Sequence, residues 1–323
     1  MESVDQGALA LVFPGQGSQY VGMGRDLFAN FKVAEETFEE ASDALHIDLR
    51  RLCLDGPEDD LTRTVNAQPA ILTVSIAVLR ILRQEAEIPV KVVAGHSLGE
   101  YSALVAAGSL SFIDAVKAVW RRGELMQSAV PPEEGGMAAL LGLCAAEVER
   151  LCLEVVAEFA VKGEKIIVAP ANYNSAEQIV ISGHTRGVER ASELAREFGA
   201  RHAIRLAVSA PFHSELMKPA AEGLAPFLEG IRWSSLQCPY IANVDAKWHG
   251  RREGIAGRLV AQMTASVLWE ESVKSMAAGG VTKFYEIGPK RVLSRLIEQI
   301  VPGAKTRSVE DRQSLKEVLA DVA

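Results

Sequence analysis

The pattern of hydrophobic and polar positions changes along the chain between short apolar runs and longer stretches with helical spacing. The short runs are typical of buried strands. Outside residues 136–209, such strands are predicted at 8–13, 92–95, 240–244 and 283–287. Helical patterns continue up to about residue 86, with Pro69 at a helix start or a kink, and terminal helices follow the last strand. Together these elements predict an α/β fold.

Residues 136–209 have a separate pattern. Strands are predicted at 137–143, 165–172, 178–182 and 202–208, and helices at 145–159 and 185–198. This order, βαββαβ, is that of a ferredoxin-like module, and residues 172–175 (Asn-Tyr-Asn-Ser) are predicted to form the turn between its middle strands. A glycine-rich entry and the Ala210-Pro211 exit favour an insertion. We therefore predict a ferredoxin-like subdomain at 136–209 within a large α/β domain made of 1–135 and 210–323.

A helix predicted at 112–130 carries two adjacent arginines. Its apolar stripe consists of Phe112, Val116, Val119, Gly123, Met126 and Val130. At about 100° per residue, Arg121 falls about 180° from the centre of this stripe, and Arg122 only about 80° from it. Arg121 is therefore expected in solvent. Arg122 flanks the buried side and needs a partner, either a protein carboxylate or carbonyl, or the carboxylate of a substrate.

The pentapeptide Gly95-His96-Ser97-Leu98-Gly99 lies between an apolar strand and a helical pattern. Glycines two positions before and after a serine let strand and helix approach closely while the serine hydroxyl projects outward. The start of the following helix directs free N–H groups and a partial positive charge toward the same point. These features favour a nucleophilic serine, the alternative being an ordinary turn between strand and helix.

Two other loops supply candidate partners for Ser97. Gln16 lies in the loop after the first strand, where it is either an N–H donor near the nucleophile or an amide that faces water. His213 lies beside a proline turn at the exit of the insertion and is a candidate base, with a surface or packed histidine as the alternative. His96 is a rival base, but its position in the tight turn is expected to direct it away from Ser97.

Composition and charge exclude several classes of protein. Hydrophobic residues make up 48% and charged residues 24% of the 323 residues, as in ordinary globular proteins. The formal net charge of −8 argues against nucleic acid or acidic membranes as partners. The apolar stretch at 67–79 is too short to span a bilayer and is interpreted as a core helix, and we see no export signal.

Cysteine and histidine spacing gives no sign of a metal site, so none is predicted. The four cysteines contain no C-x-x-C pair and are interpreted as buried free thiols of a reducing compartment. They are Cys53, Cys144, Cys152 and Cys238.

With these motifs taken in order, the chain resembles the malonyl-CoA:acyl carrier protein transacylase family from Phe13 to about Ile300. The resemblance rests on Pro14-Gly15-Gln16-Gly17-Ser18-Gln19, Gly95-His96-Ser97-Leu98-Gly99-Glu100, Arg122-Gly123, Met126-Gln127, Asn172-Tyr173-Asn174-Ser175, Pro211-Phe212-His213-Ser214, Asn243-Val244-Asp245 and Glu286-Ile287-Gly288-Pro289. It implies a hydrolase-like core with a parallel sheet, interrupted by the ferredoxin-like subdomain, and an active site in the cleft between the two.

The resemblance also implies a mechanism with a Ser97–His213 dyad and no third carboxylate, since neither Asp114 nor Asp245 has a motif around it. The backbone carbonyl of Gln262 is expected to orient His213. The Leu98 N–H and a donor from the Gln16 segment are expected to hold the oxyanion. Malonyl-CoA would load Ser97 and release CoA, and the phosphopantetheine thiol of an acyl carrier protein would then take the malonyl group.

Further residues receive roles through the same resemblance. Arg122 is expected to bind the malonyl carboxylate, and Phe212 to crowd a methyl branch on the acyl group. Lys290, Arg291 and Asn172 are possible contacts for the carrier or for CoA, with a solvated helix start as the alternative for the first two. No permanently bound cofactor is expected, and the location is expected to be cytoplasmic.

Three alternatives to a fatty-acid synthesis enzyme remain open. A free-standing polyketide-synthase acyltransferase would use the same motifs. A serine hydrolase would need an acidic triad residue between Ser97 and His213 and no buried Arg122. An inactive module that only docks the carrier would not need the intact Ser97, His213 and Arg122.

Overall fold

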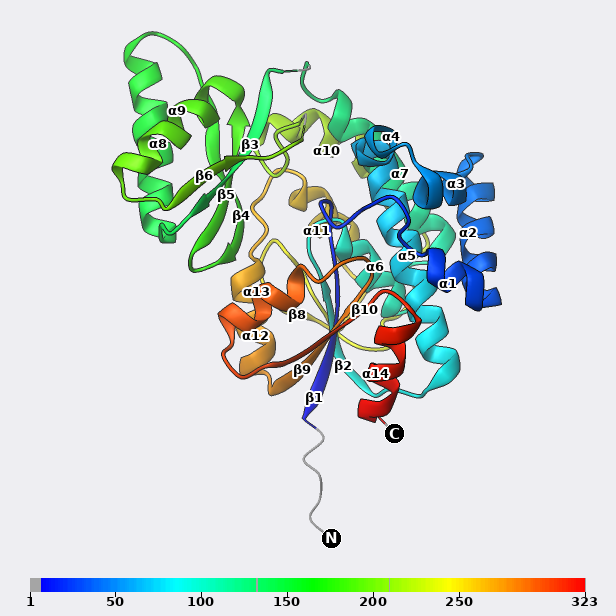
Figure 1. The fold of residues 1–323 in the computed structure, drawn as a ribbon. Coiled ribbons are helices and arrows are strands. Elements are labelled where there is room, and N and C mark those ends of the chain that lie inside the picture. The colour runs from blue at the N-terminus through cyan, green and yellow to red at the C-terminus, as the bar shows by residue number, and fades with distance from the viewer. Residues whose placement is uncertain (1–6, 132, 209, 323) are drawn as a thin grey trace.

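The structure is a computed structural model, and it describes residues 7–131, 133–208 and 210–322. Its strands form two separate sheets. A six-stranded sheet has the order β10-β9-β1-β2-β7-β8, and a four-stranded sheet has the order β4-β5-β3-β6. We call the part built on the first sheet the large unit and residues 135–205, which contain the second, the small unit. In Figure 1 the small unit, with α8 and α9, lies above and to one side of the large sheet.

The large sheet consists of β1 (Ala8–Phe13), β2 (Val90–Gly95), β7 (Tyr240–Ile241), β8 (Trp248–His249), β9 (Val281–Ile287) and β10 (Lys305–Val309). Its pairs are parallel, except for the antiparallel pair of β7 and β8. The helices of the large unit are α1 (Arg25–Asn30), α2 (Lys32–Leu45), α3 (Leu49–Asp55), α4 (Glu58–Thr62), α5 (Thr64–Glu85), α6 (Gly99–Ala106), α7 (Phe112–Ser128), α10 (Lys218–Glu229), α11 (Ile255–Gln262), α12 (Trp269–Ala278), α13 (Leu293–Ile300) and α14 (Arg312–Val322), with a 3-10 turn at Glu215–Met217.

The side chains of β1 show how the large sheet is covered on both faces. Leu9, Leu11 and Phe13 belong to the core that includes α5, α6 and α7, whereas Ala10 and Val12 belong to a core with α12 and α13. Successive side chains of a strand point to opposite faces, so a strand between two helical layers is apolar throughout. The predicted α/β fold with a parallel sheet is confirmed, and both helical layers are visible in Figure 1.

The small unit has the predicted order of elements. These are β3 (Gly135–Leu141), α8 (Ala145–Val161), β4 (Val168–Ser175), β5 (Gln178–His184), α9 (Thr185–Glu197) and β6 (His202–Arg205). All its strand pairs are antiparallel. We predicted a turn at residues 172–175, but these residues complete β4. The turn is at Ala176-Glu177. The hydrogen-bonded ladder with β5 overrides the local turn preference of the asparagines.

The large unit differs from the predictions in three details. Helix α5 begins at Thr64, so of the two roles predicted for Pro69, a helix start or a kink, the helix start is wrong. The predicted strand at 240–244 is only two residues long, Tyr240–Ile241. The sequence pattern also missed β10, where only Thr306 and Val309 are buried, because an edge strand with polar residues lacks the apolar run of a central strand.

The apolar segment interpreted as a core helix is longer than its 13 most apolar residues. Helix α5 has 22 residues and is long and apolar enough to cross a membrane, but 83% of its most apolar window is buried inside the protein. It packs between the sheet and α2 and α7, so its apolar character is explained by the core. The cysteines are free, but Cys144 is exposed and Cys238 is only half-buried, contrary to the expectation that all four are buried.

Candidate active site

Ser97 lies at the turn between β2 and α6, at the carboxyl end of the parallel strands. Its backbone has φ of 52°, in the left-handed region that side chains other than glycine rarely adopt. A Cβ on Gly95 would lie 2.0 Å from the carbonyl carbon of Gly99, and a Cβ on Gly99 would lie 2.0 Å from the Phe13 carbonyl oxygen. The two glycines are therefore required by close backbone packing, which holds the strained serine in place.

His213 lies within hydrogen-bond distance of Ser97, with 2.7 Å between its Nε2 and the serine Oγ. On the other side of the ring, Nδ1 is 2.8 Å from the backbone carbonyl oxygen of Gln262. A carbonyl only accepts, so Nδ1 carries the proton and Nε2 is free to accept the serine proton. Burial, followed by the positive charge of Arg122, lowers the pKa of His213 to about 3. The imidazole is therefore neutral at pH 7.

Among the described residues, no carboxylate contacts His213. The Asp114 carboxylate accepts from Ser111, and Asp245 pairs with His249. A backbone carbonyl thus occupies the position that an acidic residue takes in a serine-protease triad.

Arg122 on α7 is 2% exposed and reaches the same serine. Its Nη2 donates to Ser97 Oγ and to Gln262 Oε1, each at 2.9 Å, and its Nη1 donates to Gln68 Oε1 at 2.8 Å. Its partners are thus uncharged oxygens, and within the described parts of the chain no carboxylate forms a salt bridge with it. Arg121, in contrast, is exposed and pairs with Glu124 on the surface.

A cavity of about 330 Å³ opens over these residues. It is lined by Ser97, His213, Arg122, Gln16, Leu98, Phe212, Asn172 and Met137, among others. The last two come from the small unit, so both units form its walls. Among the described residues, the Leu98 N–H at the start of α6 has no hydrogen-bond acceptor. The Gln16 side chain lines the cavity but donates to Thr64 Oγ1 at 3.2 Å, and within the described residues it has no hydrogen bond with Ser97.

Lys290 and Arg291 do not line this cavity. Lys290 is exposed and its Nζ donates to the Gly17 carbonyl at 3.1 Å, next to the loop that carries Gln16. Arg291 forms an ion pair with Glu298 and donates to Thr306 Oγ1 at 3.3 Å. Lys290 is therefore at the rim of the site, whereas the charge of Arg291 is neutralised by its neighbour.

Sequence reasoning gave no role to two buried residues next to Ser97. Asn243, just after β7, accepts the Ser97 N–H at 2.7 Å through Oδ1 and donates to the Gly95 carbonyl at 2.7 Å. Glu100 accepts from the Asn243 N–H at 3.0 Å, and burial raises the pKa of Glu100 to about 7. A glutamate in an otherwise apolar helix start was the available signal, because such a side chain needs a buried partner.

His96 contacts the small unit. Its Nε2 donates to Asn174 Oδ1 at 2.8 Å, and its ring lies against Trp269. Backbone bonds add to this link, because Tyr173 N–H donates to the Val267 carbonyl and Val267 N–H to the Ala171 carbonyl. The wall that the small unit contributes is thus tied to the loop of Ser97 and to the segment after Gln262.

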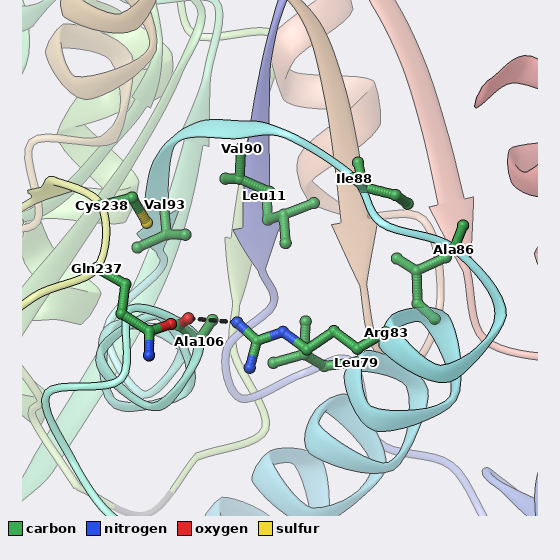
Figure 2. A pocket seen from close by; sticks show the side chains of 11 residues that line it. Leu11, Leu79, Arg83, Ala86, Ile88, Val90, Val93, Ala106, Gln237 and Cys238 are labelled. Carbon is green, nitrogen blue, oxygen red and sulfur yellow. Dashed lines mark hydrogen bonds between the residues drawn. The ribbon is translucent and has the colours of Figure 1, made fainter.

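A second cavity, of about 180 Å³, lies between α5 and strands β1 and β2. Figure 2 shows mainly aliphatic side chains around it, with the Arg83 guanidinium donating to the Ala106 carbonyl at 2.6 Å. Cys238 is its only nucleophilic side chain among the described residues, and burial raises the pKa of that thiol. No base accompanies Cys238, so this cavity is not a candidate active site. The described residues also contain no group of three or more His, Cys, Asp or Glu that could hold a metal ion.

A serine on a strained strand–helix turn, a histidine in contact with it and a free N–H at the helix start define an enzyme of acyl transfer through a serine ester. The comparisons with known proteins agree with this class. The acyl transferase domain family matches residues 10–315, and the chain belongs to this family.

The chain is similar over most of its length to proteins named malonyl CoA-acyl carrier protein transacylase. It is 47% identical over 308 residues to the malonyl CoA-acyl carrier protein transacylase of Bacillus subtilis, covering 95% of each chain. It is 46% identical to the transacylase of the same name from Escherichia coli K12, covering 90% of this chain and 92% of that one.

Solved structures show the same fold. The acyl carrier protein S-malonyltransferase of Vibrio cholerae is 43% identical, with a TM-score of 0.91 over 96% of this chain and 99% of that chain. A malonyl-transacylase in complex with its type II polyketide acyl-carrier protein is 44% identical, with a TM-score of 0.93 over 97% and 99% of the two chains.

Proposed function

We propose that this enzyme transfers malonyl from malonyl-CoA to the phosphopantetheine thiol of an acyl carrier protein in fatty-acid biosynthesis. The observation that carries the proposal is the buried Arg122 guanidinium, whose Nη2 is 2.9 Å from Ser97 Oγ and whose partners are uncharged. A planar cation beside the nucleophile suits an acyl group with a free carboxylate at its far end. The names of the relatives supply the malonyl group and the carrier.

In the first half-reaction, Ser97 Oγ attacks the thioester carbonyl while His213 Nε2 takes the serine proton. The Gln262 carbonyl keeps the imidazole in the required tautomer and stabilises the positive charge that forms. The Leu98 N–H, with a donor from the Gln16 segment, holds the tetrahedral oxyanion. The C–S bond then breaks, CoA sulfur leaves with the proton from His213, and malonyl-Ser97 remains.

In the second half-reaction, the carrier thiol loses its proton to His213 and its sulfur attacks the carbonyl of the serine ester. The bond between that carbonyl carbon and Ser97 Oγ then breaks, and His213 returns the proton to Ser97 Oγ, which restores the free enzyme. Arg122 holds the malonyl carboxylate in both halves, so the reacting carbonyl stays in place while CoA is exchanged for the carrier. The chemistry uses malonyl-CoA as a substrate and needs no resident cofactor. We also propose a cytoplasmic location, which the four free thiols and the intracellular substrate support.

A hydrolase is not favoured by the geometry. It would be expected to pair His213 with a carboxylate, whereas the partner of Nδ1 is the Gln262 carbonyl. A hydrolase also has no need for Arg122 in the cavity.

Mass spectrometry after incubation with malonyl-CoA tests the proposal. We expect one malonyl group on Ser97, its removal by a holo carrier protein, and no adduct in Ser97→Ala. Comparison of a fatty-acid carrier with a type II polyketide carrier then decides the pathway, and we expect the fatty-acid carrier to react faster. An adduct that is lost to water as fast as to the carrier would identify a hydrolase.

We further propose that Lys290 contacts the carrier. Carrier proteins are acidic, and the enzyme itself has a net charge of −8, so docking requires a local positive surface on the enzyme. Lys290 is exposed beside the loop of Gln16, and it is a better candidate than Arg291, which is paired with Glu298. Asn172 lines the cavity and is proposed to contact the pantetheine arm. Lys290→Glu should raise KM for the carrier more than KM for malonyl-CoA, whereas Lys32→Glu on α2 should change neither. Equal effects on both substrates would contradict this contact.

A further inference from the structure

Glu100 is a buried carboxylate that the proposed mechanism does not use. It lies in the first turn of α6, three residues after Ser97, and is 1% exposed. Its Oε2 accepts from Gln262 Nε2 at 2.8 Å and from the Asn243 N–H at 3.0 Å. A carboxylate in such a position costs free energy unless its hydrogen bonds offset the loss of water, so its presence requires an explanation.

Both residues that contact Glu100 also contact the reacting groups. Gln262 Oε1 accepts from Arg122 Nη2 at 2.9 Å, and Gln262 Nε2 donates to the Ser97 carbonyl at 3.1 Å. Asn243 Oδ1 accepts the Ser97 N–H at 2.7 Å. Glu100 is therefore one residue removed from both the substrate-binding arginine and the nucleophile.

Glu100 Oε2 is the nearest of three acceptors at the donor end of the Gln262 amide, at 2.8 Å from Nε2, against 3.1 Å for the Ser97 carbonyl and 3.3 Å for Asn243 Oδ1. An amide has a donor end and an acceptor end, and the two directions differ only in their hydrogen-bond partners. In the observed direction, the donor end faces Glu100 Oε2 and the acceptor end faces Arg122. In the reversed direction, two acceptors would meet at Glu100 and two donors would meet at Arg122, and each mismatch is costly in a buried site.

We infer that Glu100 is a positioning residue that holds the Gln262 amide in one direction and so directs the Arg122 guanidinium toward the acyl carboxylate. This inference rests on the proposed malonyl transfer. Without the acceptor at position 100, Gln262 Nε2 keeps only its two longer contacts, so the amide is held less firmly and its Oε1 can move away from Arg122. The guanidinium then loses one of its three partners beside Ser97, and its hold on a carboxylate weakens.

The test compares malonyl-CoA with acetyl-CoA as donors, because only malonyl needs Arg122. General damage to the fold lowers both rates, whereas misdirection of Arg122 lowers the malonyl rate selectively. Glu100→Leu removes the acceptor, and we expect the ratio of malonyl to acetyl kcat/KM to fall about tenfold to a hundredfold. Glu100→Gln can turn its amide oxygen to the Oε2 position, so it should restore most of the ratio.

Glu286 provides a matched control. It is another buried carboxylate, on β9, and it accepts three backbone N–H groups of residues 292–294 at the start of α13. Among the described residues it has no hydrogen bond with Ser97, Arg122 or Gln262. Glu286→Gln should lower the thermal stability and leave the donor ratio unchanged. Rates are expressed per folded molecule, counted by far-UV circular dichroism.

A double variant shows whether Glu100 acts through the Gln262 side chain. If it does, Glu100→Leu combined with Gln262→Leu should have the same donor ratio as Gln262→Leu alone. Independent, multiplying effects of the two changes on the ratio would overturn the inference. So would an unchanged ratio in Glu100→Leu. Wild-type protein that forms no malonyl adduct would instead refute the proposed function, so the two failures are distinguishable.

Discussion

The site around Ser97 and the core of the small unit differ in the side chains that they bury, charged in the first and apolar in the second. The buried acidic and basic side chains, Glu100, Arg122, His213 and Glu286, all belong to the large unit. The core of the small unit is aliphatic, with members such as Leu140, Leu151, Val155 and Ile181, and the buried polar residues on its strands are uncharged. The two regions meet at the cavity, where Met137 and Asn172 form a wall opposite the reacting groups.

This difference separates two tasks. The large unit holds charges out of water at the end of its sheet, which costs stability and is offset by hydrogen bonds among the site residues. The small unit gains its stability from apolar burial and supplies a shaped wall. Substitutions around Ser97 should therefore alter the transfer rate and the preference among acyl donors, and substitutions in the core of the small unit should alter the stability.

Among changes that leave Ser97 and His213 in place, the largest effect on transfer is expected from Arg122→Ala. Loss of the guanidinium leaves the malonyl carboxylate without its partner in a buried cavity, and malonyl loading should fall about a hundredfold or more. Acetyl loading, slow in the wild type, should gain relative to malonyl. Initial rates with both donors measure this, and Arg121→Ala on the exposed face of α7 is the neighbouring control. Equal losses for both donors would show that Arg122 does not face the acyl group.

A smaller change in selectivity is expected from Phe212→Ser. Phe212 precedes His213 and lines the cavity, and we expect its ring to crowd a methyl branch at the α-carbon. Overpacking of this kind costs about 1–3 kcal/mol, so removal of the ring should narrow the preference for malonyl over methylmalonyl by about tenfold. Competition between the two CoA esters measures it. Phe212→Leu keeps most of the bulk and should keep the preference, and an unchanged preference in Phe212→Ser would place the ring away from the α-carbon.

The pH dependence should be weak where an ordinary histidine titrates. The pKa of His213 is lowered to about 3 in the folded protein, so the base stays neutral and kcat/KM per folded molecule should not fall through pH 6.5. The unfolded chain binds a proton near pH 6.5 that the folded chain does not. The contribution of His213 to stability is therefore present above pH 6.5 and is lost as the pH falls toward 3. Glu100 has a pKa raised to about 7, so the test uses Glu100→Gln, and a loss of rate with its midpoint near pH 6.5 in that variant would contradict this assignment.

The smallest effect on chemistry is expected from Leu151→Ala in the core of the small unit. Leu151 is fully buried, and such a truncation costs about 2–5 kcal/mol of stability. Denaturant unfolding should show this loss, while the malonyl transfer rate per folded molecule stays at the wild-type value. Leu104→Ala on α6, which follows the serine turn, should lower both the stability and the malonyl transfer rate. A reduced rate in Leu151→Ala would show that the wall of the small unit takes part in positioning.

Much of the fold was predictable because its signals are local. The apolar run of β1, the helical stripe of α7 and the βαββαβ order of the small unit depend on residues close together in sequence. The glycines of the serine turn were predictable for the same reason. Strand β10 and the full length of β4 were not, since their pairing partners, rather than their own composition, make them strands.

For the site, the residue types at Ser97, His213 and Arg122 could be proposed from motifs, and the resemblance added the Gln262 carbonyl. The hydrogen bonds of Glu100 and Asn243 could not be proposed, because they join residues more than a hundred positions apart in the chain. The same holds for the different environments of Lys290 and Arg291, which depend on whether Gly17 or Glu298 lies nearby.

By itself, then, the sequence determined where strand, turn and helix follow one another and which side chains are candidates for the chemistry. Backbone sterics and the spacing of apolar residues act between neighbours, so no knowledge of the fold is needed to interpret them. The tertiary structure alone decided which of those side chains meet, because the parallel order of the strands brings the ends of β1, β2 and β7 together. At that meeting point, Arg122 has uncharged hydrogen-bond partners and Glu100 accepts a hydrogen bond from Gln262. Burial there also lowers the pKa of His213.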